Sequence, residues 1–168
     1  MTVLKPERLE LLAADIREAS NQLDKIVRGV QEVLVLAEDD PARRHIYTES
    51  LALKLQSFYT GCERVFRVIA DELNGGLPSG SDWHLRLLQR ASVAYRDRPQ
   101  IIAKTTADAL DDYLAFRHVV RNAYTFDLDA ERVEELARSL PTTFDAFSRD
   151  LQRFVAWLED TAARLSDH

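Results

Sequence analysis

Two arginines, a histidine, an amide and a tyrosine lie within nine consecutive residues of this chain, Phe116-Arg117-His118-Val119-Val120-Arg121-Asn122-Ala123-Tyr124. On a helix, which turns by about 100° per residue, the side chains of residues 117, 118, 121 and 122 fall within an arc of roughly 140°, and the apolar residues take the opposite side. Guanidinium groups bind anions, and imidazole exchanges protons near neutral pH. The polar arc is therefore compatible with a small phosphate-binding site on one helix face.

The two arginines have no partner on their own helix. Arg117 and Arg121 are four residues apart, where like charges repel by a few tenths of a kcal/mol, and no Asp or Glu occurs three or four residues from either of them. We expect their partner to come from another helix, another chain or a bound anion. We also expect Arg117 to be exposed, so that Arg117→Ala would change stability little.

Length and composition favour one cytoplasmic helical domain spanning residues 1–168. The chain has 168 residues, 46% of them hydrophobic, a net charge of −6 and a single cysteine, Cys62, which we expect to be a buried, inert thiol. No apolar run approaches the ~20 residues that a membrane span needs, and the first residues do not resemble a signal peptide. The acidic charge argues against wrapping bulk nucleic acid, although residues 80–125 carry seven Lys or Arg against five Asp.

Apolar residues recur at helical spacing along most of the chain and never alternate as in strands. The pattern predicts long helices over residues 6–37, 41–74, 105–124 and from 129 onward, with a shorter helix over 82–96. A short connection makes consecutive long helices antiparallel. The predicted fold is all-α, an up-down four-helix bundle with a short accessory helix.

Local signals place the ends of these helices. We expect an N-cap at Asp40 before Pro41, a left-handed stop at Asn74-Gly75-Gly76, a capping box from Thr105 to Asp108, and a kink or break at Pro141 with a restart cap formed by Thr142 and Asp145.

The chain resembles the HEPN superfamily, and in particular the HepT-like proteins encoded beside a minimal nucleotidyltransferase. The resemblance covers about residues 45–137 and rests on the Phe116–Tyr124 motif, on Ser57-Phe58-Tyr59-Thr60-Gly61-Cys62-Glu63-Arg64 and on Trp83-His84-Leu85-Arg86-Leu87-Leu88. It implies a homodimeric toxin of a toxin-antitoxin pair that cleaves or binds RNA without a metal ion or other cofactor. It also implies a nucleotidyltransferase-type antitoxin that modifies the tyrosine at the place of Tyr124.

Asn122 departs from the family pattern, because it stands where active members carry the catalytic histidine. In those enzymes a base takes the proton of the ribose 2′-hydroxyl while arginine holds the charge on phosphate. An amide cannot exchange that proton. The candidates for a displaced acid or base are His118, one turn away, and His84 on the accessory helix, whereas Arg117 and Arg121 remain candidates for binding phosphate.

Each of these residues also has a structural interpretation. His84 could bond backbone at a helix start, His118 could fill a polar pocket at a dimer interface, and Tyr124 could be a core tyrosine whose hydroxyl reaches the rim. Three functions therefore stay open. The first is an RNA-cleaving or RNA-binding toxin, the second a non-catalytic subunit that binds a nucleotidyltransferase and is modified by it, and the third a helical adaptor whose arginines pair with internal carboxylates such as Glu63. No zinc-ligand spacing or glycine-rich phosphate loop is present.

Overall fold

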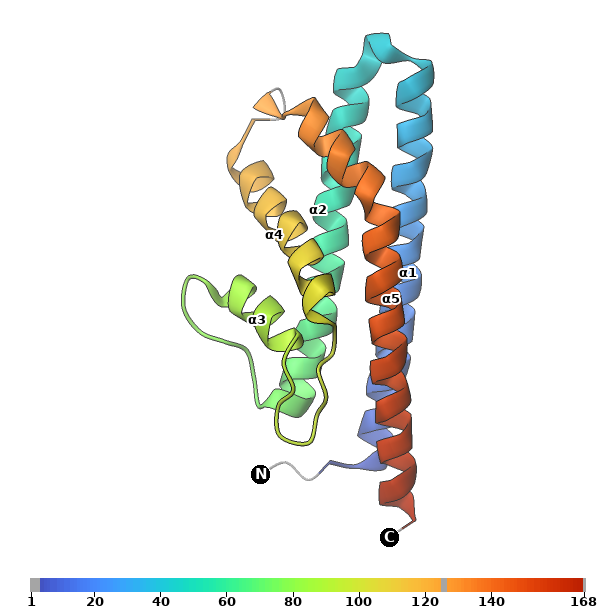
Figure 1. Ribbon diagram of the computed structural model, residues 1–168, viewed down its shortest axis with the longest axis vertical. Coiled ribbons are helices and arrows are strands. Elements are labelled where there is room, and N and C mark those ends of the chain that lie inside the picture. The colour runs from blue at the N-terminus through green and yellow to red at the C-terminus, as the bar shows by residue number, and fades with distance from the viewer. Residues whose placement is uncertain (1–3, 125–126, 168) are drawn as a thin grey trace.

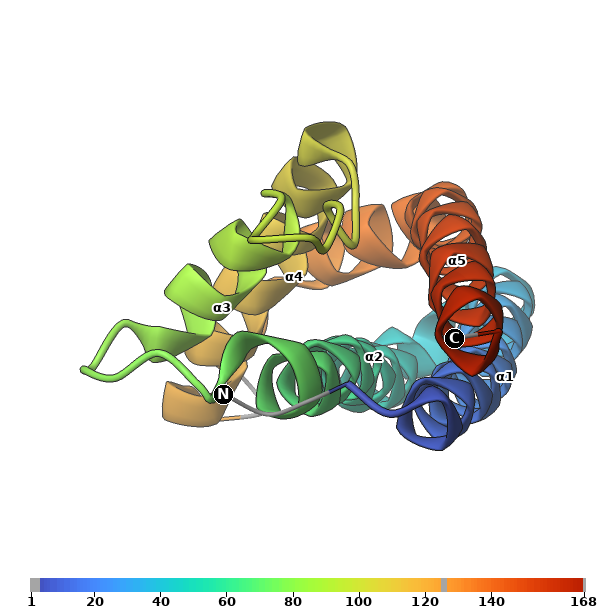
Figure 2. The ribbon, with the colours of Figure 1, turned by 90° about the horizontal axis from the view of Figure 1, so that it is seen from below.

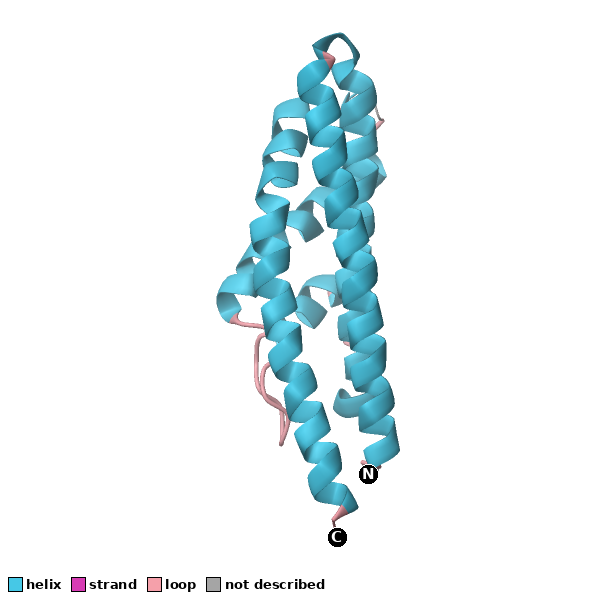
Figure 3. Cartoon of the chain, turned by 90° about the vertical axis from the view of Figure 1, so that its right-hand side faces the viewer, coloured by secondary structure: helices cyan, strands magenta, loops and turns pink. Residues whose placement is uncertain are grey.

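The computed structural model describes residues 4–124 and 127–167, and within these ranges the regular structure is helical (Figures 1 and 3). Its α-helices are α1 (Pro6–Asp39), α2 (Arg44–Ile69), α3 (Trp83–Ala91), α4 (Lys104–Asn122) and α5 (Ala130–Ser166). The only strand-like pairing among the described residues is an isolated bridge between Tyr95 and Arg98. The all-α prediction is confirmed.

The four long helices alternate in direction, as the bundle prediction requires. In Figure 1, α1 and α4 run upward and α2 and α5 run downward, with α3 beside the lower part of α2. Seen along the bundle in Figure 2, α1 and α5 lie together on one side, α2 lies in the middle, and α3 and α4 lie on the other side. The helix carrying the polar motif, α4, therefore packs on α2 and α3.

The predicted apolar stripes form one core. The apolar residues that recur at helical spacing in α5 are buried, and so are those of α2. In α5 they are Val133, Leu136, Leu140, Phe144, Phe147, Leu151, Phe154 and Leu158, and in α2 they are Leu51, Leu55, Phe58, Cys62, Val65 and Ile69. Cys62 is buried among them as a free thiol, and burial raises its pKa well above the ordinary value, in agreement with an inert residue. At Gly61, a Cβ would lie 2.6 Å from Leu23 Cδ2, so the glycine lets α1 and α2 approach closely.

Some helix ends agree with the sequence and others correct it. Gly75 has a φ of 76°, the predicted left-handed stop, and it follows a π-helical turn (Ala70–Asn74) that ends the second long helix. α4 ends at Asn122 rather than Tyr124, since Ala123 is extended. The accessory helix ends at Ala91 rather than residue 96, because the Ala91 carbonyl accepts hydrogen bonds from the N–H groups of Ile101 and Ile102.

Three predicted caps are absent, each for a structural reason. A 3₁₀ turn (Pro41–Arg43) follows Asp40, whose side chain makes no cap. α4 starts without the Thr105–Asp108 box, because Asp150 of α5 accepts the N–H of Ala103 at 2.9 Å and the hydroxyl of Thr106 at 2.6 Å.

α5 continues through Pro141 without a break, so no restart cap forms at Thr142. Packing of its buried stripe keeps the helix continuous across the missing N–H group. Figure 1 shows the first, orange turns of α5 inclined to its lower part.

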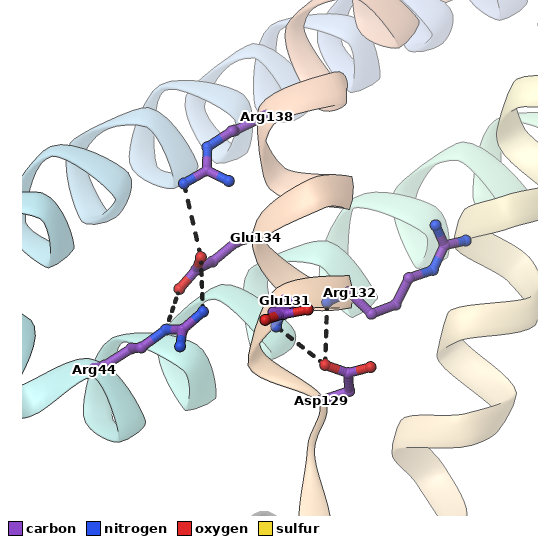
Figure 4. A network of polar contacts seen from close by, with 6 residues as sticks. All are labelled: Arg44, Asp129, Glu131, Arg132, Glu134 and Arg138. Atoms are coloured by element: carbon purple, nitrogen blue, oxygen red, sulfur yellow. Dashed lines mark hydrogen bonds and ion pairs between the residues drawn. The ribbon is translucent and has the colours of Figure 1, made fainter.

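The start of α5 is held by a polar network (Figure 4). The Asp129 carboxylate accepts hydrogen bonds from the backbone N–H groups of Glu131 and Arg132 and so acts as the N-cap of α5. Glu134 accepts two hydrogen bonds from Arg44 at 2.7 and 3.1 Å and lies 3.7 Å from Arg138. The network ties the start of α5 to the start of α2.

Candidate functional site

Arg117 of α4 is buried against α2. Its side chain is 5% exposed, and its Nη2 donates to Glu63 Oε2 at 2.9 Å. The partner thus comes from another helix, one of the three sources that the sequence allowed, but the expected exposure of Arg117 is wrong. Because α4 lies on α2, the arginine must carry its charge into the interface and needs the carboxylate there.

Two other residues of α2 complete the surroundings of Arg117. Its guanidinium lies 4.9 Å from the centroid of the Tyr59 ring, within cation–π range, and its Nη1 donates to the Thr60 hydroxyl at 3.4 Å. The Tyr59 hydroxyl and Arg117 Nε are buried with no hydrogen-bond partner among the described residues. Burial is the main reason why the pKa of Tyr59 lies far above its ordinary value, so Tyr59 is neutral and contributes its ring face.

His84 at the start of α3 joins the same carboxylate. Its Nδ1 lies 2.6 Å from Glu63 Oε2 and 3.0 Å from Arg117 Nη2. Because the guanidinium has only donors and an ionised carboxylate only accepts, the charge-balanced arrangement has both Nδ1–H and Nη2–H donating to Oε2. This assignment leaves the lone pair on His84 Nε2, so that the imidazole can accept a proton there.

Aromatic rings surround His84. Its ring is stacked on that of Trp83 with centroids 3.7 Å apart, and it meets the ring of His118 edge to face at 5.9 Å. The guanidinium of Arg67 lies 5.6 Å from the Trp83 ring. α2, α3 and α4 each therefore contribute to one cluster, the Glu63 cluster, which consists of Tyr59, Glu63, His84, Arg117 and His118.

The remaining polar residues of the motif face solvent. His118, Arg121 and Asn122 are exposed. The Asn122 amide donates to the His118 carbonyl at 2.9 Å, and Arg121 forms no ion pair with any residue in the described ranges. Tyr124, which follows the helix, is 72% exposed and is not a core residue. Of the four residues in the arc predicted from the sequence, Arg117 is therefore buried and the other three are exposed.

The described ranges contain neither a candidate metal site nor a candidate membrane span. No group of three or more His, Cys, Asp and Glu residues there is placed to hold a metal ion. No described helix combines the length and apolarity that a membrane span needs.

Comparison with known proteins gives one family. A family model described as HepT-like protein matches residues 50–158, about two thirds of the 168 residues. The chain belongs to the HepT-like family. No curated protein and no solved structure gives a significant match. The family region starts near the beginning of α2 and contains all residues of the Glu63 cluster.

Sequence reasoning found most of this cluster in the HepT-like chain but gave no role to Tyr59, or to Trp83, whose ring is stacked on that of His84. A signal for Tyr59 exists, since it lies four residues before Glu63 and thus on the same face of a helix. The pairing of Glu63 with Arg117 appeared only as part of the adaptor hypothesis. Its geometry depends on how α4 crosses α2.

Proposed function

We propose that this HepT-like protein is the toxin component of a toxin-antitoxin pair and acts on RNA without a metal ion, with His84 as the general base. The observation that carries the proposal is the 2.6 Å contact between His84 and Glu63, beside exposed His118. A carboxylate that fixes a histidine tautomer and supports the protonated ring is a recurrent arrangement in acid–base catalysis.

The chemistry follows from the positions of the two histidines. His84 Nε2 accepts the proton of the ribose 2′-hydroxyl, and the oxygen attacks the adjacent phosphorus. The bond from phosphorus to the 5′-oxygen breaks, and His118 in its protonated form gives that oxygen a proton. The products are a 2′,3′-cyclic phosphate and a 5′-hydroxyl, so neither water nor an external reactant is consumed in this step.

The arginines have different roles in this scheme. Arg121 is exposed and has no ion pair in the described part of the chain, so it is available to bind phosphate. Arg117 is already neutralised by Glu63. It acts as a positioning residue that holds the carboxylate against His84, which revises its expected role as a direct phosphate ligand.

The partners of the HepT-like chain belong to the same proposal. A homodimer would bring two copies of Arg121 and His118 into one cationic cleft. A nucleotidyltransferase-type antitoxin would modify Tyr124, which is 72% exposed. We place the pair in the cytoplasm.

A second function is favoured by Asn122. The amide occupies the position of the family's catalytic histidine and bonds the His118 carbonyl, and it cannot move a proton. In this alternative, the protein is a non-catalytic subunit that binds a nucleotidyltransferase and is its modification target.

RNA cleavage by purified single variants separates the two functions. We expect His84→Ala to abolish cleavage, His118→Ala to reduce it by about 10²-fold or more, and Asn122→Ala to leave it measurable. The matched control is His45→Ala, since His45 is exposed at the start of α2, away from the cluster. Wild-type cleavage that survives both cluster variants would refute the role of the histidines.

Restoring the family pattern gives an independent result. Asn122→His places an imidazole one turn beyond His118, and we expect it to increase RNA cleavage or toxicity on expression. If wild type and Asn122→His are both inert on RNA while the wild-type chain binds a nucleotidyltransferase, the subunit function stands and the toxin function fails.

Light scattering tests the proposed dimer. We expect about twice the chain mass of 19.2 kDa at micromolar concentration. A mass equal to one chain across that range would contradict a dimeric cleft.

A further inference from the structure

A second polar site lies on the opposite face of α3 from His84. Relative to His84, helical rotation places Arg86 and Arg90 at roughly 200° and 240°. These residues line a cavity of about 400 Å³, which we call the arginine pocket. Its lining includes Arg86, Arg90, Arg98, Asn74, Tyr95 and Val93. It shares no residue with the Glu63 cluster.

Arg98 is a buried charged residue that lines this pocket. Arg98 is 4% exposed. Its Nε donates to the Asn74 side-chain oxygen at 2.9 Å, and its Nη1 donates to the Pro99 carbonyl at 2.7 Å. Its Nη2 forms no hydrogen bond with a described residue. Burial lowers the pKa of Arg98, as expected for a desolvated cation without a nearby anion.

No carboxylate of the described chain neutralises the pocket. Neither Arg86, Arg90 nor Arg98 pairs with a carboxylate in the described ranges, and no Asp or Glu lines the cavity. Arg86 donates only to the neutral Ser79 carbonyl, at 2.8 Å. Arg98 is thus a buried cation without a paired carboxylate, and Arg86 and Arg90 beside it are free to contact an anion.

A tight backbone turn after α3 places Arg98 in the lining of the pocket. The N–H groups of Tyr95 and Arg98 each donate to the other's carbonyl, at 2.9 and 3.0 Å, and Arg96 between them has a φ of 53°. This left-handed conformation is unfavourable for a residue with a side chain. Tyr95 of the same turn lines the pocket and is 41% exposed, and the guanidinium of Arg96 lies 5.2 Å from the centroid of the Tyr95 ring.

We propose that the arginine pocket binds a nucleoside phosphate, with the phosphates between Arg86, Arg90 and Arg98 and the base on the Tyr95 ring. Arginine forks match phosphate oxygens, and a tyrosine ring stacks on bases of any sequence. The cavity volume falls in the range of pockets for small ligands, roughly 300–1,000 Å³. This site is separate from the proposed RNA chemistry, and its failure would leave the Glu63 cluster unaffected.

Isothermal titration calorimetry on the full chain tests the proposal with ATP, AMP, adenosine and tripolyphosphate at one ionic strength. We expect affinity to increase from AMP to ATP and adenosine to give no binding heat. ATP should bind more tightly than tripolyphosphate, and Tyr95→Ala should remove that difference. Absence of ATP binding at millimolar concentration would overturn the site, and equal affinity for ATP and tripolyphosphate would overturn the assignment to a nucleoside.

Substitutions locate the binding. Arg90→Ala should weaken ATP binding about tenfold, the loss of one charge-assisted contact; Arg90 is exposed, so the fold does not depend on it. Arg98→Lys keeps the charge but loses the fork and should also weaken binding, with circular dichroism to verify folding. The matched control is Arg64→Ala, an exposed arginine on α2 outside the pocket. If Arg90→Ala binds ATP as tightly as Arg64→Ala does, the proposed pocket is wrong.

Discussion

Arg117→Met tests whether the Glu63 cluster is structural as well as functional. The substitution removes the partner of a carboxylate that is 7% exposed and also removes the cation from the Tyr59 ring. Breaking a buried ion pair by deleting one member costs about 3–5 kcal/mol, because the other charge is left uncompensated. His84 still bonds Glu63, so we expect the lower end, about 3 kcal/mol.

This loss is large enough to measure in two ways. For a chain of this size, each kcal/mol lowers the melting temperature by roughly 2–4 °C, so that Tm should fall by roughly 6–12 °C. Urea unfolding followed by far-ultraviolet circular dichroism should show a lower midpoint with an unchanged slope. The double variant Arg117→Met with Glu63→Gln should recover part of the loss, because a neutral amide carries no buried charge.

Arg121→Met is the matched control, four residues further along the same helix. Arg121 is exposed, and an exposed substitution changes stability by no more than about 0.5 kcal/mol. If Arg117→Met is as stable as Arg121→Met, Arg117 is not a structural ion-pair member and the role assigned to it here is refuted.

Three further changes test other parts of the fold. Glu134→Gln should lower stability near neutral pH and lose its effect in acid, because hydrogen bonds from Arg44 hold the pKa of Glu134 below its ordinary value. That contribution is present above the unfolded pKa and is lost as pH falls through the folded pKa. Thermal melts of the two proteins should therefore converge in acid, and a difference that stays constant with pH would contradict the pair. Tyr113→Phe removes the buried hydrogen bond to the Leu136 carbonyl, 2.8 Å long, and should cost about 1 kcal/mol in urea unfolding; no loss would show that this bond contributes nothing. Burial raises the pKa of Tyr113 to about 12, so its contribution should also be lost as pH rises from about 10 to 12, and Tyr113→Phe should be less sensitive to alkali than wild type. Asp150→Asn should destabilise the start of α4, since the Asp150 carboxylate accepts hydrogen bonds from the Ala103 N–H group and the Thr106 hydroxyl. Amide hydrogen exchange should become faster at the start of α4, and unchanged exchange there would contradict this role.

The helices and their order were predictable from the sequence because helical periodicity is local. The apolar residues that recur at helical spacing in α5, from Val133 to Leu158, are buried, and the stop at Gly75 needs only the conformational freedom of that one residue. Local caps were less predictable. The start of α4 is satisfied by Asp150, 47 positions from Ala103, and a distant residue of this kind replaces a cap that the local sequence could have formed.

The chemistry of the motif depended on the tertiary structure. The sequence placed Arg117, His118, Arg121 and Asn122 on one face and excluded a helical partner for Arg117, but a helical wheel does not show which part of an arc a neighbouring helix covers. Packing of α4 on α2 buried Arg117 beside Glu63, 54 positions away, and left the other three exposed.

The arginine pocket was still less accessible to sequence reasoning. Its central cation, Arg98, lies in a non-periodic segment, and its burial depends on contacts with Asn74, 24 positions away, and with the adjacent Pro99 carbonyl. The sequence by itself determined the residue types and the helices that carry them. Only the tertiary structure decided which charges are neutralised inside the protein and which remain available to a ligand, because charge compensation depends on distances between segments far apart in the chain.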